Sequence, residues 1–140
     1  MSAGCINNTS EKQQIVTPTP SATAVALFYK GFDAYIEGNY TTALQFYNES
    51  ISSDPKFTRA WEAKGDVLVR LNRTSEAISA YDSALALEST VPEIWNSRGE
   101  ALMIQGRFTE AVDSFEKALQ IAPNYTAAKE NKDLALAKLK

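Results

Sequence analysis

Histidine is absent from this chain of 140 residues, and cysteine occurs once, at Cys5. Without histidine the chain has no Ser-His or Cys-His nucleophile, no histidine general base and no histidine-ligated zinc. A lone cysteine forms no intramolecular disulfide and no cysteine cluster that would hold a metal. These two absences exclude most catalytic and metal-binding classes, so we expect a protein that is not an enzyme and carries no cofactor and no metal.

Long apolar runs and an excess of basic charge are also missing. No run of eighteen apolar residues occurs, which excludes a membrane-spanning helix within this sequence. The formal net charge is −3, from 14 lysines and arginines against 17 aspartates and glutamates, so the chain lacks the basic surface that binds nucleic acid. With 44% hydrophobic and 22% charged residues, the composition is that of a folded domain.

Residues of similar type recur at a spacing of 34 positions between residues 24 and 125. Three segments, 24–57, 58–91 and 92–125, align without a gap. Five of the aligned columns are Leu27, Trp61 and Trp95; Gly31, Gly65 and Gly99; Ala43, Ala77 and Ala111; Tyr47, Tyr81 and Phe115; and Ser50, Ala84 and Ala118. Such a period indicates a repeat architecture, in which each copy packs on the next.

Each copy predicts two short amphipathic helices joined by a tight turn. In the third copy we expect the first helix at residues 93–105, with Gly106 supplying the backbone freedom needed at a helix end. Apolar residues of the following segment recur at the spacing of one helical face. Gly99 and Ala111 are small where the two helices would cross, and Phe115 would fill the space beside them.

This pattern resembles the tetratricopeptide repeat (TPR), a helical hairpin of 34 residues with characteristic Trp, Gly, Ala and Phe or Tyr columns. The resemblance implies an all-α fold, a right-handed α-solenoid of stacked antiparallel helical hairpins. A last helix over residues 126–140 would cap the array, since Lys129, Lys132, Lys138 and Lys140 make its outer side polar. Three hairpins and the cap give seven helices.

Residues 1–23 differ from the repeats, since they are rich in Ser, Thr, Asn, Gln and Pro and have no helical period. Such a composition predicts a flexible tether. Ser2-Ala3-Gly4-Cys5 is similar to the end of a prokaryotic lipoprotein signal, although no apolar stretch precedes it. The similarity implies a lipid on Cys5 and a domain anchored to the outer cell surface. The alternative is a cytoplasmic protein with an N-terminus of no further role.

Acceptor triplets for N-glycosylation (N-x-S/T) are more frequent than expected. Chance placement of the residues would give roughly one triplet in a chain of this composition. The acceptor triplets occur at Asn7, Asn8, Asn39, Asn48, Asn72 and Asn124. Part of the excess reflects asparagine in repeat turns. The remainder favours an extracytoplasmic, glycosylated protein.

The TPR resemblance places partner contacts on one face of the first helix of each copy. These candidate groove residues are Phe28, Phe32 and Tyr35; Arg59, Glu62, Asp66 and Arg70; and Glu93, Asn96, Glu100 and Met103. Family members that grip a C-terminal carboxylate use Lys and Asn at such positions, whereas Phe28, Phe32 and Asp66 stand here. We therefore expect a non-catalytic adaptor that binds a protein or peptide segment with apolar and basic residues.

Other interpretations of the same residues remain open at this point. The charges of Arg59, Glu62, Asp66 and Arg70 have a spacing that allows pairing along one helix without any ligand. Phe28 and Phe32 form an aromatic end of the array that a second copy of the chain would cover, giving a homodimer or a self-associating structural subunit. The chain could also be the TPR portion, or companion, of a larger enzyme such as a glycosyltransferase.

Overall fold

The computed structural model describes residues 18–140, and this part of the chain consists of seven α-helices without strands. Cys5, Asn7, Asn8 and most of the predicted tether lie outside the described residues. The helices are α1 (Ala22–Ile36), α2 (Tyr40–Ser53), α3 (Thr58–Arg70), α4 (Thr74–Leu87), α5 (Pro92–Ile104), α6 (Phe108–Ile121) and α7 (Thr126–Lys138). The all-α fold with seven helices agrees with the prediction, and α5 begins and ends one residue earlier than the repeat pattern suggested.

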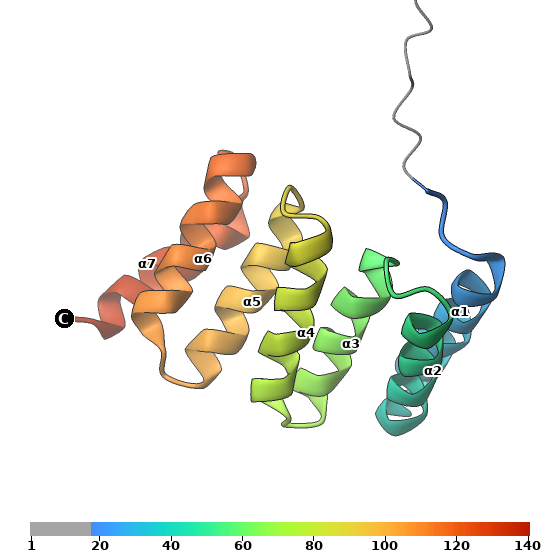
Figure 1. Cartoon of the computed structure of the whole chain (residues 1–140). Coiled ribbons are helices and arrows are strands. Elements are labelled where there is room, and N and C mark those ends of the chain that lie inside the picture. The colour runs from blue at the N-terminus through green and yellow to red at the C-terminus, as the bar shows by residue number, and fades with distance from the viewer. Residues whose placement is uncertain (1–17) are drawn as a thin grey trace, which may run out of the picture.

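The helices form three hairpins, α1 with α2, α3 with α4 and α5 with α6, and α7 packs on α6. They follow one another along a single direction, so α1 and the C-terminus lie at opposite ends of the array (Figure 1). α3 also contacts α5, and α5 contacts α7. The odd-numbered helices therefore make one layer, called the inner layer below, and α2, α4 and α6 make the outer layer. This is the stacked-hairpin solenoid that the sequence predicted.

The turns within the hairpins depend on residues with positive φ. Gly38 has φ +79°, Gly106 has φ +72°, and Asn72 takes the same place with φ 59°. Glycine adopts this left-handed region without a steric penalty, and asparagine tolerates it better than most residues. The turn predicted at Gly106 is confirmed, and the other two copies have a positive-φ residue at the same place.

Close crossing within each hairpin follows from the glycine column. A Cβ atom at Gly31, Gly65 or Gly99 would lie 2.5–2.6 Å from a ring carbon of the aromatic residue 16 positions later, which is well inside contact distance. The predicted packing of Phe115 beside Gly99 is therefore confirmed. Because each aromatic ring fills the space that a side chain would occupy, the two helices approach closely and the ring is held in the core.

The tryptophan column fixes the loops between copies. The indole nitrogen of Trp61 donates a hydrogen bond of 2.9 Å to the carbonyl oxygen of Pro55, and Trp95 donates an equivalent bond of 2.9 Å to Ser89. Both bonds reach back six residues, from the first helix of a copy to the loop before it. They explain why an aromatic residue with a donor recurs at this position, since the loop carbonyl is satisfied there.

The C-terminal helix α7 differs from the expected polar cap. Ala128 and Ala135 are fully buried, and Lys132 pairs with Glu116 of α6 at 3.0 Å. Leu134 and Leu139, however, are 57% and 49% exposed, so the outer side of α7 is mixed rather than polar. The reason is geometric: a single helix packs only one narrow face on the last hairpin, and leucines on its other faces stay exposed.

Candidate binding groove

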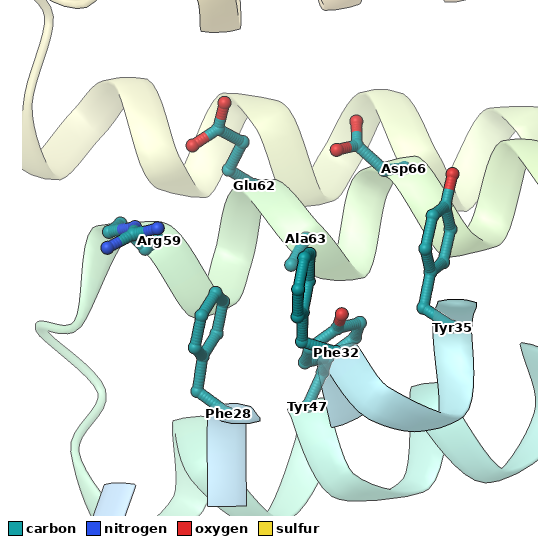
Figure 2. A pocket seen from close by; sticks show the side chains of 8 residues that line it. All are labelled: Phe28, Phe32, Tyr35, Tyr47, Arg59, Glu62, Ala63 and Asp66. Atoms are coloured by element: carbon teal, nitrogen blue, oxygen red, sulfur yellow. The ribbon is translucent and has the colours of Figure 1, made fainter. Parts of the chain in front are cut away.

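The inner-layer surface of α1, α3 and α5, which we call the groove, carries the predicted contact residues. A pocket of about 170 Å³ lies in this groove between α1 and α3 (Figure 2). The pocket unites all three predicted residues of α1 with three of the four predicted on α3. The lining residues are Phe28, Phe32, Tyr35, Tyr47, Arg59, Glu62, Ala63 and Asp66.

Tyr47 was not among the candidate groove residues, although it forms part of the pocket. It belongs to α2 of the outer layer, and its ring lies against Gly31, which has no side chain to block it. The ring therefore extends from α2 past Gly31 of α1 and reaches the pocket from the outer layer. The glycine and tyrosine columns of the repeat contained this signal, because a glycine facing an aromatic residue indicates a ring that penetrates between two helices.

Phe28 is a wall of the pocket but not an open contact surface. Only 5% of the residue is exposed, and its ring lies 5.5–5.7 Å from the rings of Tyr29, Tyr47 and Phe57. The expectation that Phe28 is exposed at the end of the array is wrong, because the loop that carries Phe57 comes back over it. Phe32, which is 44% exposed, is the accessible phenylalanine of this helix.

The two arginines of α3 stack on aromatic rings of the first hairpin. The guanidinium carbon of Arg59 lies 5.1 Å from the centre of the Phe28 ring, and that of Arg70 lies 4.9 Å from the centre of the Tyr40 ring. Arg70 also donates a hydrogen bond to the Tyr40 hydroxyl. Among residues 18–140 neither arginine forms an ion pair with Glu62 or Asp66. The alternative in which these four charges pair along α3 is therefore wrong.

Glu62 lines the same pocket as Arg59 but forms no ion pair with it among residues 18–140. Within residues 18–140 it has neither a hydrogen bond nor an ion pair from another side chain. The pKa of Glu62 is raised to about 7, first by burial and then by the negative charges of Asp66, Glu93 and Glu88, while Arg59 opposes the rise. The groove thus holds a carboxylate that loses solvation in the folded chain and gains no partner in return.

Asp66 is held by the second hairpin. Its Oδ1 accepts a hydrogen bond of 2.6 Å from the Tyr81 hydroxyl. Burial raises the pKa of Asp66, whereas the bond from Tyr81 lowers it and the charge of Glu100 raises it. Tyr81 is nearly fully buried, so this bond fixes the carboxylate at the upper edge of the pocket beside Tyr35 (Figure 2).

The third copy contributes a different arrangement, because a side chain of α7 binds two of its groove residues. Asn131 of α7 donates through Nδ2 to Asn96 Oδ1 at 3.1 Å and to Glu100 Oε1 at 2.8 Å. Asn96 donates to the same Glu100 oxygen at 3.0 Å and is 5% exposed. These predicted groove residues therefore join α5 to α7. Glu93 is exposed and Met103 is half-buried, and neither lines the α1–α3 pocket.

Asn131 was missed by the sequence analysis. It lies on the helix that continues the repeat register, 35 residues after Asn96. The available signal was that Asn131 lies only one position beyond the 34-residue equivalent of Asn96, which is a polar residue. It could not be interpreted from one sequence, because helix periodicity does not indicate which side chains of adjacent copies meet.

A second and larger cavity, of about 800 Å³, lies on the other side of the Phe28 and Arg59 side chains. Both residues line the two cavities, so their stacked pair forms the partition between them. The other lining residues are Pro18, Pro20, Val25, Tyr29, Asp54, Lys56, Phe57, Thr58, Leu87 and Glu88. This cavity places the segment before α1 next to the start of α3.

Four of the predicted glycosylation sites lie in the described part of the chain. Asn39, Asn72 and Asn124 are exposed at turns between helices. Asn48 is exposed but lies inside α2. Ser50, the hydroxyl residue of its triplet, is buried and donates to the Ala24 carbonyl at 2.7 Å. The turn sites are therefore more accessible than Asn48 in the folded chain.

Residues 18–140 contain neither a candidate metal site nor a candidate membrane-spanning helix. No group of three or more His, Cys, Asp or Glu side chains there is arranged to hold a metal ion. None of the helices in this range has the length and apolar character required to cross a membrane.

Comparison with solved structures finds similar folds at low sequence identity. The first TPR of Spaghetti (RPAP3), bound to an HSP90 peptide, has a TM-score of 0.82 at 24% identity, over 84% of this chain and 93% of that chain. The Yersinia enterocolitica type III secretion chaperone SycD, in complex with a peptide of the translocator YopD, has a TM-score of 0.80 at 19% identity, over 86% and 97%. The second TPR domain of human RPAP3, in complex with an HSP70 peptide, has a TM-score of 0.79 at 21% identity, over 84% and 98%.

Comparison with curated proteins gave no match. The family comparison is decisive, because the tetratricopeptide repeat family matches residues 31–92 and again residues 62–126, which together make up more than half of the chain. With the 34-residue period, the glycine–aromatic crossings and the stacked hairpins, this match establishes that the chain belongs to the tetratricopeptide repeat family.

Proposed function

We propose that this chain is a non-catalytic interaction module that binds a peptide or protein segment along the groove of α1, α3 and α5. The observation that carries the proposal is the α1–α3 pocket, where exposed aromatic surface of Phe32 adjoins the unpaired carboxylate of Glu62. Solenoid surfaces of this kind suit extended ligands. The peptide complexes of the first RPAP3 domain and of SycD, which share the fold, support peptide capture.

The ligand we propose carries apolar and basic residues. Apolar side chains would cover Phe32, and basic ones would compensate the charge of Glu62, Asp66 and Glu93. The HSP90 peptide in the first RPAP3 domain has the sequence SRMEEVD, with three acidic residues against a single arginine, so its net charge is negative. Such a ligand would bring negative charge to a groove that already holds uncompensated carboxylates, so it would bind this chain poorly.

A random-peptide display library screened against the full chain tests this proposal. We expect selected peptides to combine apolar and basic residues and the SRMEEVD peptide to be retained weakly or not at all. Phe32→Ala should reduce binding of the selected peptides, whereas Leu136→Ala, an equally accessible apolar residue on α7, should not. Failure to select any peptide, or equal loss in both variants, would contradict the groove proposal.

Self-association is the second candidate function. Tyr29, Phe32 and Ile36 of α1 are 53%, 44% and 67% exposed, which leaves an apolar strip on the first helix of the described array. A second copy of the chain would remove this strip from water. Sedimentation of the full chain over a hundredfold range of concentration separates the two candidates: dimers that retain no peptide favour self-association.

We also propose that the protein acts outside the cytoplasm, held to the cell surface by a lipid on Cys5. The support comes from the sequence alone, namely the small residues before Cys5 and the excess of acceptor triplets. The intact mass of the protein from its native membrane fraction tests this location. A lipid on Cys5 with glycans on asparagine is the expected result, and an unmodified cytosolic chain beginning at Met1 would contradict it.

A further inference from the structure

We propose that the pocket between α1 and α3 is a subsite for one arginine side chain of the bound segment. Its guanidinium would lie against the rings of Phe32 and Tyr35 and face the carboxylates of Glu62 and Asp66. This inference rests on the proposed function and adds to it the identity and position of one anchoring residue.

The walls of the pocket have the chemistry that a guanidinium requires. The rings of Phe32 and Tyr35 extend from α1 toward α3, and Glu62 and Asp66 line the same pocket from α3, with their carboxyl groups drawn on the side away from α1 (Figure 2). A planar guanidinium stacks on an aromatic face and donates several hydrogen bonds in its own plane. The pocket therefore offers a stacking surface and acceptors to the same group.

The chain itself already holds guanidinium groups in this setting. Arg59 stacks on Phe28 and Arg70 stacks on Tyr40, at two points of the contact between the first and second hairpins. Neither of them occupies the acceptor groups of Glu62. The pocket between these two arginines repeats their aromatic environment and leaves the carboxylate open to a third cation.

The size of the pocket suits one side chain. Its volume of about 170 Å³ is smaller than the roughly 300–1,000 Å³ of pockets that hold drug-sized molecules. A cofactor or a folded ligand would not fit, whereas a single long side chain would fill it. Phe32, Tyr35, Glu62 and Asp66 of its lining are also groove residues, so a segment lying in the groove would insert one residue there.

The electrostatic balance favours a positive residue over a neutral or acidic one. Glu62 faces Asp66 and Arg59 on its own helix, Glu93 on α5 and Glu88 at the end of α4, so negative groups outnumber positive ones around it. An apolar side chain would remove more water from these carboxylates without replacing it, and an acidic one would add repulsion. A cation supplies the missing partner through charge-assisted hydrogen bonds.

Amino-acid amides are suitable probes, because they present one side chain without a peptide. The full chain labelled with ¹⁵N would be titrated with Nα-acetyl-arginine amide, Nα-acetyl-citrulline amide and Nα-acetyl-lysine amide, following backbone amide shifts. Citrulline has nearly the shape of arginine and no charge. We expect arginine to saturate shifts in α1 and α3, and citrulline to bind more weakly by on the order of tenfold. Equal affinity of the two would overturn the subsite.

Two charge-matched variants locate the effect. Glu62→Gln should weaken arginine binding by on the order of tenfold. Asp113→Asn, which removes one negative charge from an exposed position on the outer helix α6, should leave it unchanged. Equal weakening in both variants would show a general charge effect and overturn the proposal, as would shifts confined to α5 and α7. Lysine binding as tightly as arginine would overturn the preference for a guanidinium.

The outcome separates this inference from the proposed function. Peptides captured by the full chain without any preference for arginine would refute the subsite and leave the interaction module intact. Binding of the arginine amide in the pocket without capture of any peptide would support the subsite and refute the module.

Discussion

Replacing Glu62 by glutamine should stabilise the unliganded chain at pH 8 and change its stability little at pH 4.5. The pKa of Glu62 rises from 4.5 to about 7 on folding, because the carboxylate is buried beside Asp66, Glu93 and Glu88. The folded chain therefore binds this proton more tightly than the unfolded chain does. As pH increases from 4.5 through about 7, the ionised group lowers the free energy of unfolding, and glutamine removes that cost.

The size of the effect follows from the same shift. A change from 4.5 to about 7 corresponds to at most ~3 kcal/mol at high pH. Solvent in the open groove screens the charge, so we expect Glu62→Gln to raise the free energy of unfolding at pH 8 by about 1 kcal/mol. Glutamine has nearly the volume of glutamate, and packing should be unaffected.

Urea unfolding followed by circular dichroism at pH 4.5 and pH 8 measures this difference. Asp113→Asn serves as the control for lost charge and should shift the midpoint little at either pH. The reasoning fails if Glu62→Gln lowers stability at pH 8, or if it changes stability equally at both pH values. A gain in stability at pH 8 together with weaker binding of a basic ligand would identify Glu62 as a group held for binding rather than for folding.

Four further substitutions test the packing. Gly99→Ala should lower the free energy of unfolding by about 2 kcal/mol in urea titrations, because the added Cβ would lie 2.5 Å from the Phe115 ring; unchanged stability would contradict the crossing. Phe28→Ala should cost about 3 kcal/mol and Phe32→Ala less than about 1 kcal/mol by the same assay, and similar losses would contradict the burial of Phe28. Asn131→Ala removes two hydrogen bonds to α5 and should cost about 1 kcal/mol, with faster amide hydrogen exchange confined to α7; uniform exchange along the chain would refute this local role.

The architecture was predictable from the sequence because each of the three copies contains the same residue types at the helix crossing and at the turn. The pattern predicted that Phe115 packs beside the small Gly99, and the structure places the two in contact. The pattern also predicted that Gly106 ends a helix with a backbone conformation that favours glycine, and its φ is positive. Both features depend on neighbours within one hairpin, so the spacing of residue types is sufficient to indicate them.

The site was predictable only in part, because it depends on contacts between hairpins. Phe28 lies on the groove-facing side of its helix but is buried by Phe57, which follows the first hairpin. Arg59 and Arg70 lie three and four residues from Glu62 and Asp66, a spacing that allows ion pairs along a helix. They stack on Phe28 and Tyr40 instead, because the aromatic first hairpin lies beside α3. Helix periodicity defines which residues share a face, and it does not define what that face meets.

The central claim is that the groove of α1, α3 and α5 binds a segment with apolar and basic residues. It is tested most directly by mapping, on the ¹⁵N-labelled full chain, the backbone amides whose shifts change when a display-selected peptide is added. The account predicts changes concentrated in α1 and α3 around Phe32 and Glu62, which in Glu62→Gln require a higher peptide concentration to reach saturation. Changes confined to the outer helices α2, α4 and α6, or no saturable change at all, would contradict it.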